Sequence, residues 1–146
     1  MIPPSAGRGR AVIRWLAWCG LAALGNAAAA PPVEAGHGAP ARAPIVHVEQ
    51  VKRLLDEGQA VVLVDLRPED GFQQGHLPGA HSLPLRQLRR RYGEIPSTRP
   101  VVLYCACPEE ELTAAFRFLS DEGYRNVRVL PEGFPGWVRQ GYPLER

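Results

Sequence analysis

The stretch VVLYCACPEEELTAA, residues 101–115, decides the fold that we expect for this chain. It opens with four apolar residues, as do strands that are buried on both faces of a parallel sheet. Cys105 and Cys107 follow. The apolar residues after the three glutamates recur at helical spacing: Leu112, Ala115, Phe116 and Leu119. A strand that leads into a helix is typical of α/β domains, in which ligands bind beyond the carboxyl ends of the strands. The pattern therefore places Cys105 where such a domain carries its chemistry.

Strands and helices alternate along the rest of the chain. Apolar spacing predicts a helix within 45–58, and a valine-rich run predicts a buried strand at 60–67. Glycines and prolines make 75–84 a loop with a short strand at 81–83. The remaining predicted elements are short helices at 85–93 and 134–141, strands at 99–105 and 126–130, and a longer helix at 109–123. We therefore predict a small three-layer α/β domain, whose central, mostly parallel sheet carries helices on both faces.

The N-terminal segment looks like a targeting signal. Three arginines precede the apolar run WLAWCGLAALGNAAAA, which ends in small residues, as secretory signals do. We predict a signal peptide at 1–29 and hence an exported, periplasmic protein. The alternative is an uncleaved membrane anchor, although the run is shorter than the roughly 20 residues that a spanning helix needs.

Two further segments complete the predicted organisation. Residues 30–44 are dense in Ala, Pro and Gly without a hydrophobic period, which predicts a flexible or extended linker. Residues 45–146 then form the single folded domain, which is long enough for one modest hydrophobic core.

Charge gives no reason to expect a nucleic-acid partner. The chain has 17 basic and 15 acidic residues, but three arginines and no acid lie within 1–29. The rest therefore carries 14 basic and 15 acidic residues, a net charge of −1. The local basic cluster RQLRRRYGE (86–94) fits the solvated face of a short helix. We expect contact with a membrane only through an uncleaved signal segment.

Three stretches resemble the rhodanese family. They are DLRPEDGFQQGHLPGAHSLPL (65–85), the strand VVLYC with its following loop and helix, and GYRNVRVLPEGFPGW (123–137). They occur in the family's order, and the resemblance covers about 45–143. It implies a parallel sheet flanked by helices and a sulfurtransferase, an enzyme of the transferase class, with no cofactor.

The resemblance also implies roles for individual residues. Cys105 matches the family's cysteine, which takes up sulfane sulfur as a persulfide and passes it on. The implied partners are a sulfur donor, either a thiol persulfide or thiosulfate, and a thiol or protein acceptor. Asp65 and Arg67 match a pair that supports the neighbouring loop.

The loop after Cys105 departs from the family pattern. Family members usually have an arginine or other donor groups there, whereas this chain has no arginine between Cys105 and Arg117. The predicted substrate-binding loop consists of Ala106, Pro108, Glu109, Glu110 and Glu111, with Cys107 among them. The family's Gly-Gly before the closing aromatic residue has also become Glu132-Gly133.

The chemistry of this loop points in two directions. A helix beginning near Pro108 would favour a thiolate at Cys105, and the backbone of 106–110 would cradle the persulfide. Acids in a first helical turn stabilise the helix, but they also oppose a thiolate and repel dianions such as thiosulfate, phosphate or arsenate. The acids therefore argue against a phosphatase or an arsenate reductase and favour a thiol persulfide or a protein as donor.

Cys107 leaves several interpretations open. It could attack a persulfide on Cys105 and form a disulfide, so that both cysteines are catalytic and redox-active. It could equally be a small buried filler beside Pro108. A metal site would need further ligands, and none is predicted. We therefore predict an exported sulfurtransferase; the alternatives are a non-catalytic binding module of the same fold and a CxC thiol–disulfide redox protein.

Overall fold

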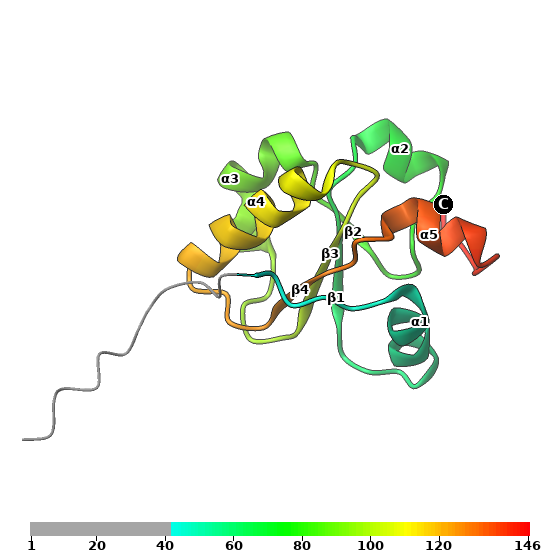
Figure 1. The fold of residues 1–146 in the computed structure, drawn as a ribbon. Helices are drawn as coiled ribbons and strands as arrows, with labels where there is room; N and C mark the ends of the chain where they lie inside the picture. Colours follow the sequence, from blue (N-terminus) through cyan, green and yellow to red (C-terminus); the bar gives the residue numbers. More distant parts are fainter. Residues whose placement is uncertain (1–41) are drawn as a thin grey trace, which may run out of the picture. The chain divides into compact units, whose positions relative to one another are not determined.

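The structure is a computed structural model that describes residues 42–146. Its α-helices are α1 (Val48–Asp56), α2 (Glu69–Gln74), α3 (Leu88–Arg91), α4 (Glu109–Asp121) and α5 (Gly133–Arg139). The strands are β1 (Val62–Asp65), β2 (His81–Ser82), β3 (Val101–Tyr104) and β4 (Val127–Val129), and two 3-10 turns, η1 (Leu85–Gln87) and η2 (Tyr92–Glu94), flank α3. Figure 1 shows these elements in place. The predicted signal peptide and nearly all of the predicted linker lie outside the described residues.

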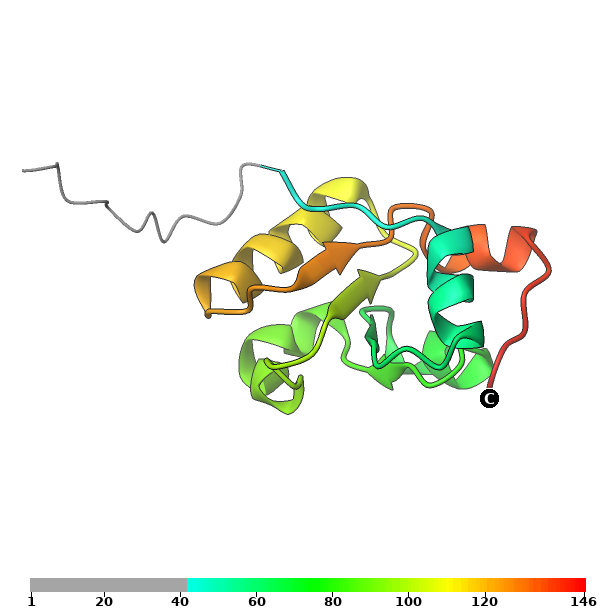
Figure 2. The same ribbon diagram turned by 90° about the horizontal axis from the view of Figure 1, so that it is seen from below.

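The four strands form one parallel sheet in the order β2-β1-β3-β4. Ile45 forms an isolated parallel bridge with Val129, so the chain before α1 runs beside β4 (Figure 2). Because all strands run in one direction, their carboxyl ends meet at one edge of the sheet, and the loops after β1, β2 and β3 are neighbours. The predicted α/β fold with a parallel sheet is confirmed.

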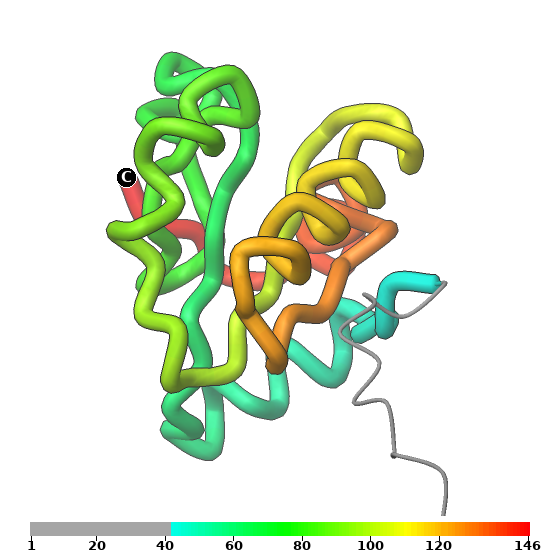
Figure 3. The backbone as a smooth tube through the Cα atoms, turned by 90° about the vertical axis from the view of Figure 1, so that its left-hand side faces the viewer, coloured from blue at the N-terminus to red at the C-terminus, as the bar shows by residue number. Residues whose placement is uncertain are grey.

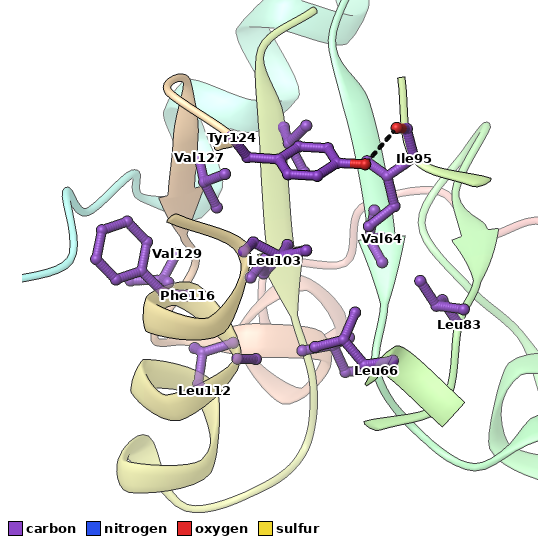
Figure 4. Close-up of a cluster of buried hydrophobic side chains, with 14 of the residues drawn as sticks. Val64, Leu66, Leu83, Ile95, Leu103, Leu112, Phe116, Tyr124, Val127 and Val129 are labelled. Atoms are coloured by element: carbon purple, nitrogen blue, oxygen red, sulfur yellow. Dashed lines mark hydrogen bonds between the residues drawn. The ribbon is translucent and has the colours of Figure 1, made fainter. Parts of the chain in front are cut away.

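Helices cover both faces of the sheet, and the strand pleat decides which side chains each face receives. Val101, Leu103 and Cys105 pack with α3 and α4, whereas Val102 and Tyr104 pack with α1 and α5. Figure 4 shows side chains of the core cluster on the α3 and α4 face. In this cluster the Tyr124 hydroxyl donates a hydrogen bond to the Ile95 carbonyl. Figure 3 follows the chain from β3 through α4 into β4, the crossover that joins parallel neighbours.

Most predicted elements are present, with two differences. The predicted strands and helices are there but shorter, and the short strand predicted at 81–83 is the two-residue β2. The sequence analysis missed α2, which follows Pro68 and buries none of its residues. None of the helices within residues 42–146 is long and apolar enough to span a membrane.

Candidate active site

Cys105 lies directly after β3, between the central strand and the helix α4. Its side chain is buried, with 4% exposed, on the face of the sheet that α4 covers. A disulfide joins it to Cys107, and the two Cα atoms are 5.5 Å apart. Both predicted catalytic cysteines are therefore in direct contact.

The backbone of Cys105 is held by the start of α5. The Phe134 N–H donates a hydrogen bond of 3.0 Å to the Cys105 carbonyl oxygen. Gly133 has a φ of +54°, and a Cβ at this position would lie 2.0 Å from the same oxygen. Only glycine fits so close an approach, so position 133 requires glycine although the residue before it is a glutamate.

Glu132 itself faces away toward α1. Its carboxylate accepts a hydrogen bond of 2.5 Å from His47 Nδ1, at the residue that caps α1. The Glu132 carboxylate raises the pKa of His47 above its usual value of 6.5, first through this hydrogen bond and then through its charge. The departure from the family's Gly-Gly pair thus creates an ion pair between α1 and α5.

A cavity of about 310 Å³ opens beside the cysteines. The loops after three neighbouring strands form its walls, as expected for the carboxyl edge of a parallel sheet. The lining residues are Leu66, Arg67, Pro68, Pro84, Leu85, Arg86, Cys105, Ala106, Cys107 and Glu111.

Asp65 and Arg67 form a buried ion pair at the end of β1. Asp65 is 0% exposed and Arg67 is 8% exposed. The guanidinium donates Nε and Nη2 hydrogen bonds to the carboxylate at 2.6–3.0 Å, and Nη2 also reaches the Gly75 carbonyl at 2.7 Å. The pair therefore ties the end of β1 to the loop that leads into β2.

Arg67 also connects this pair to the cysteine. Its guanidinium carbon lies 3.6 Å from the centroid of the Phe134 ring, a cation–π contact. Phe134 is the residue whose N–H holds the Cys105 carbonyl. Tyr104 lies on the other face of β3, where burial and then the Asp65 charge raise the pKa of its hydroxyl well above its usual value. A neutral phenol therefore packs beside the pair.

The structure separates the three glutamates of the predicted loop. Glu111 lines the cavity, as does Ala106. Glu109 and Glu110 instead line a separate surface hollow beside α4. Pro108 caps α4 and is not its first helical residue, and its carbonyl accepts the Glu111 N–H at 3.1 Å. Only one of the three acids therefore faces the space beside the cysteines.

Sequence reasoning missed Arg86 as part of the site. It assigned the basic cluster 86–94, which begins with Arg86, to the solvated face of a short helix, whereas Arg86 lines the cavity from η1, after β2. The signal that could have found it is the adjacency of β2 to β1, which brings the residues after Ser82 to the same edge as Cys105. The cavity therefore has two arginines on its walls, although the loop itself has none.

The predicted supporting residues Asp65 and Arg67 lie at the site, whereas His76 belongs to the surrounding structure. His76 stacks on Phe72 at 3.7 Å between ring centroids, and its backbone pairs with Glu145. Within residues 42–146 no group of three or more His, Cys, Asp or Glu side chains is placed to hold a metal ion.

The fold and the site define a small parallel α/β domain with a cysteine at the carboxyl end of a central strand. The family model for the rhodanese-like domain matches residues 47–140. This chain belongs to the rhodanese-like domain family.

Similar proteins include sulfurtransferases. A sulfurtransferase of Allochromatium vinosum is 34% identical over 96 residues, which cover 66% of this chain and 89% of that protein. The thiosulfate sulfurtransferase GlpE of Shewanella oneidensis is 31% identical over 83 residues, covering 57% of this chain and 81% of that protein. The solution structure of a rhodanese-like domain from Anabaena has a TM-score of 0.63 and 26% identity, covering 71% of this chain and 80% of that chain.

Proposed function

We propose that this protein is an exported sulfurtransferase that carries sulfane sulfur as a persulfide on Cys105. One observation carries the proposal: Cys105 lies at the carboxyl end of the central strand β3, on the wall of a cavity formed by three strand-end loops. Membership of a family with sulfurtransferase relatives supports it. The N-terminal sequence pattern is the basis for proposing export.

The first step begins from the reduced protein. The Cys105 thiolate attacks the outer sulfur of a thiol persulfide, and the S–S bond of the donor breaks. The electron pair of that bond leaves with the donor's inner sulfur, which takes up the proton of the donor's S–SH group and departs as a thiol, so that Cys105 is left as a persulfide anion. A helix N-terminus favours a thiolate, and Cys105 shortly precedes the start of α4. The sulfane sulfur brings its own oxidation level to Cys105, so the transfer needs no further oxidant.

The second step uses one of two acceptors. An external thiolate can attack the outer sulfur and carry it away, which regenerates Cys105. Alternatively, the Cys107 thiolate attacks Sγ of the Cys105 persulfide, expels hydrosulfide and forms the Cys105–Cys107 disulfide. A thiol reductant must then supply two electrons to reopen the cycle. The disulfide in the structure matches the product of this second route.

The disulfide also favours a second candidate function. A protein whose Cys105–Cys107 pair only exchanges electrons with other thiols would need no sulfur donor. The cavity beside the pair would then bind a partner thiol. A binding module of the same fold, without chemistry, is the third candidate.

Intact mass measurement separates these candidates. The full chain is reduced, freed of reductant and exposed to a thiol persulfide or, separately, to thiosulfate. We expect a gain of one sulfur atom on Cys107→Ser, and on the wild type either this gain or the loss of two hydrogens with release of sulfide. Cys105→Ser is the control and must gain no sulfur under the same conditions.

Two other outcomes would point elsewhere. Oxidation of the cysteine pair by a plain disulfide, with no sulfur gained by Cys107→Ser from either donor, would favour the thiol–disulfide function. An unchanged mass with all reagents would leave the binding module. Cell fractionation tests export separately, because a protein retained in the cytoplasm contradicts the proposed location without affecting the chemistry.

A further inference from the structure

Opposite charges face the cavity from two different loops. Arg86 follows β2 and lies in η1, whereas Glu111 lies in the first turn of α4, after β3. The ion pairs within residues 42–146 are His47–Glu132, Lys52–Asp56, Asp65–Arg67, His76–Glu145 and Arg91–Glu94. Arg86 and Glu111 therefore share a cavity without pairing with each other or with another charged side chain of this part of the chain.

The other charge on the cavity wall is already neutralised. Arg67 is bonded to the Asp65 carboxylate and the Gly75 carbonyl, and its face is covered by Phe134. The lining residues without charge are leucines, prolines, an alanine and the two cysteines. A ligand in this cavity thus meets one unpaired cation and one unpaired anion.

We propose that the sulfur donor is a small amino-acid-type persulfide that carries both a carboxylate and an ammonium group. Arg86 binds the carboxylate and Glu111 binds the ammonium, while the outer sulfur reaches Cys105. This inference rests on the proposed sulfur transfer. A cavity of about 310 Å³ lies at the lower end of the range for small-molecule sites, which suits a donor the size of an amino acid.

The charges explain why such a donor is preferred. A zwitterion compensates both side chains, and each contact is a charge-assisted hydrogen bond. A dianion such as thiosulfate would be attracted by Arg86 but repelled by Glu111. A purely cationic donor would be attracted by Glu111 but repelled by Arg86. Since the sulfur moves by the attack on the outer sulfur described above, the two charged contacts orient the donor and take no part in bond making.

Four donors that share the persulfide group but differ in their charged substituents test this inference. They are the persulfides of cysteine, 3-mercaptopropionate, cysteamine and 2-mercaptoethanol, which carry both charges, the carboxylate alone, the ammonium alone and neither. The reduced full chain is mixed with each donor, and the rate of sulfur gain at Cys105 is followed by intact mass. We expect the cysteine persulfide to react roughly tenfold faster than the uncharged donor, the factor that corresponds to about 1.4 kcal/mol.

Variants assign the effect to individual side chains. Arg86→Gln should slow the two carboxylate donors by about fivefold to tenfold and change the other two by less than about twofold. Glu111→Gln should act in the same way on the two ammonium donors. Arg90→Gln removes an exposed arginine from α3 outside this cavity, and it is expected to change no donor selectively. Equal rates for the four donors, or equal slowing of all four by Arg86→Gln, would overturn the inference.

Binding without reaction keeps the two proposals distinguishable. The S-methyl thioethers of the same four thiols are unreactive and similar in shape, and their binding to Cys105→Ser can be measured by NMR titration. If S-methylcysteine binds tightest and Arg86→Gln abolishes this preference, the charge recognition is supported. This holds even if no donor transfers sulfur, a result that would contradict only the proposed sulfur transfer. Equal binding of all four thioethers refutes the charge recognition even if sulfur transfer is observed.

Discussion

Replacement of Gly133 by alanine tests the contact that holds the Cys105 carbonyl. The new Cβ would lie 2.0 Å from this oxygen, whereas ordinary contact begins at 3.4 Å. The start of α5 must therefore move away by more than 1 Å, which breaks the hydrogen bond from the Phe134 N–H. The perturbation thus acts on the backbone of the candidate nucleophile without replacing any side chain of the site.

The magnitude follows from two contributions. Alanine in the left-handed region costs about 1–2 kcal/mol. A buried carbonyl that loses its hydrogen bond costs about 1–3 kcal/mol more. We expect the free energy of unfolding to fall by about 2–5 kcal/mol in Gly133→Ala. Urea denaturation followed by circular dichroism measures this change.

Gly58→Ala is the matched control. Gly58 has a φ of +65°, close to the +54° of Gly133, but a Cβ there would have no neighbour within 4 Å. It should therefore lose only the conformational contribution of about 1–2 kcal/mol. Equal destabilisation of the two variants, within about 0.5 kcal/mol, would refute the inference that α5 is packed against the Cys105 carbonyl.

Two other perturbations have expected outcomes. Asp65→Asn leaves the buried Arg67 guanidinium without its carboxylate, and urea denaturation should show a loss of about 3–5 kcal/mol; a loss below about 1 kcal/mol would contradict a structural role for the pair. Because Glu132 raises the pKa of His47 in the folded protein, protonation of His47 stabilises the fold. This stabilisation is fully present below the usual pKa of 6.5 and is lost as the pH rises through the higher folded value, so wild type should lose stability relative to His47→Gln over that range. NMR titration of the ring checks the direction, and a pKa at or below 6.5 would contradict it.

Long apolar patterns made the centre of the fold predictable. The strands β1 and β3 are buried on both faces, and α4 has four buried residues at helical spacing, so each left a clear signal in the sequence. The helix α2 left none, because it is six residues long and buries no side chain that would impose a period. An element that packs against the sheet shows a periodic pattern of apolar residues in the sequence, and α2 has no such pattern because it buries none of its residues.

The candidate site likewise has features that the sequence predicted and features that it did not. The position of Cys105 followed from a general property of parallel sheets, and Asp65 and Arg67 came from the family resemblance. The position of Arg86 depends on β2, which has only two residues, lying beside β1. Likewise, the turn of Glu111 toward the cavity and of Glu110 away from it depends on the exact rotation of α4. Such details arise from packing between distant segments, which no local pattern records.

The pleat of β3 has a consequence for how the thiol is placed. Successive side chains of a strand point to opposite faces, so Cys105 shares its face with Val101 and Leu103 because it stands an even number of positions from each. Cys105 therefore reaches the cavity because it occupies an odd-numbered position, on the same face as Val101 and Leu103. A shift of β3 by a single residue would exchange Tyr104 and Cys105 between the faces and bury a phenol where the thiol now stands. The register of β3 therefore decides where the reactive thiol lies. Its four residues are all paired with β1, and three of them are also paired with β4, and these pairings hold that register.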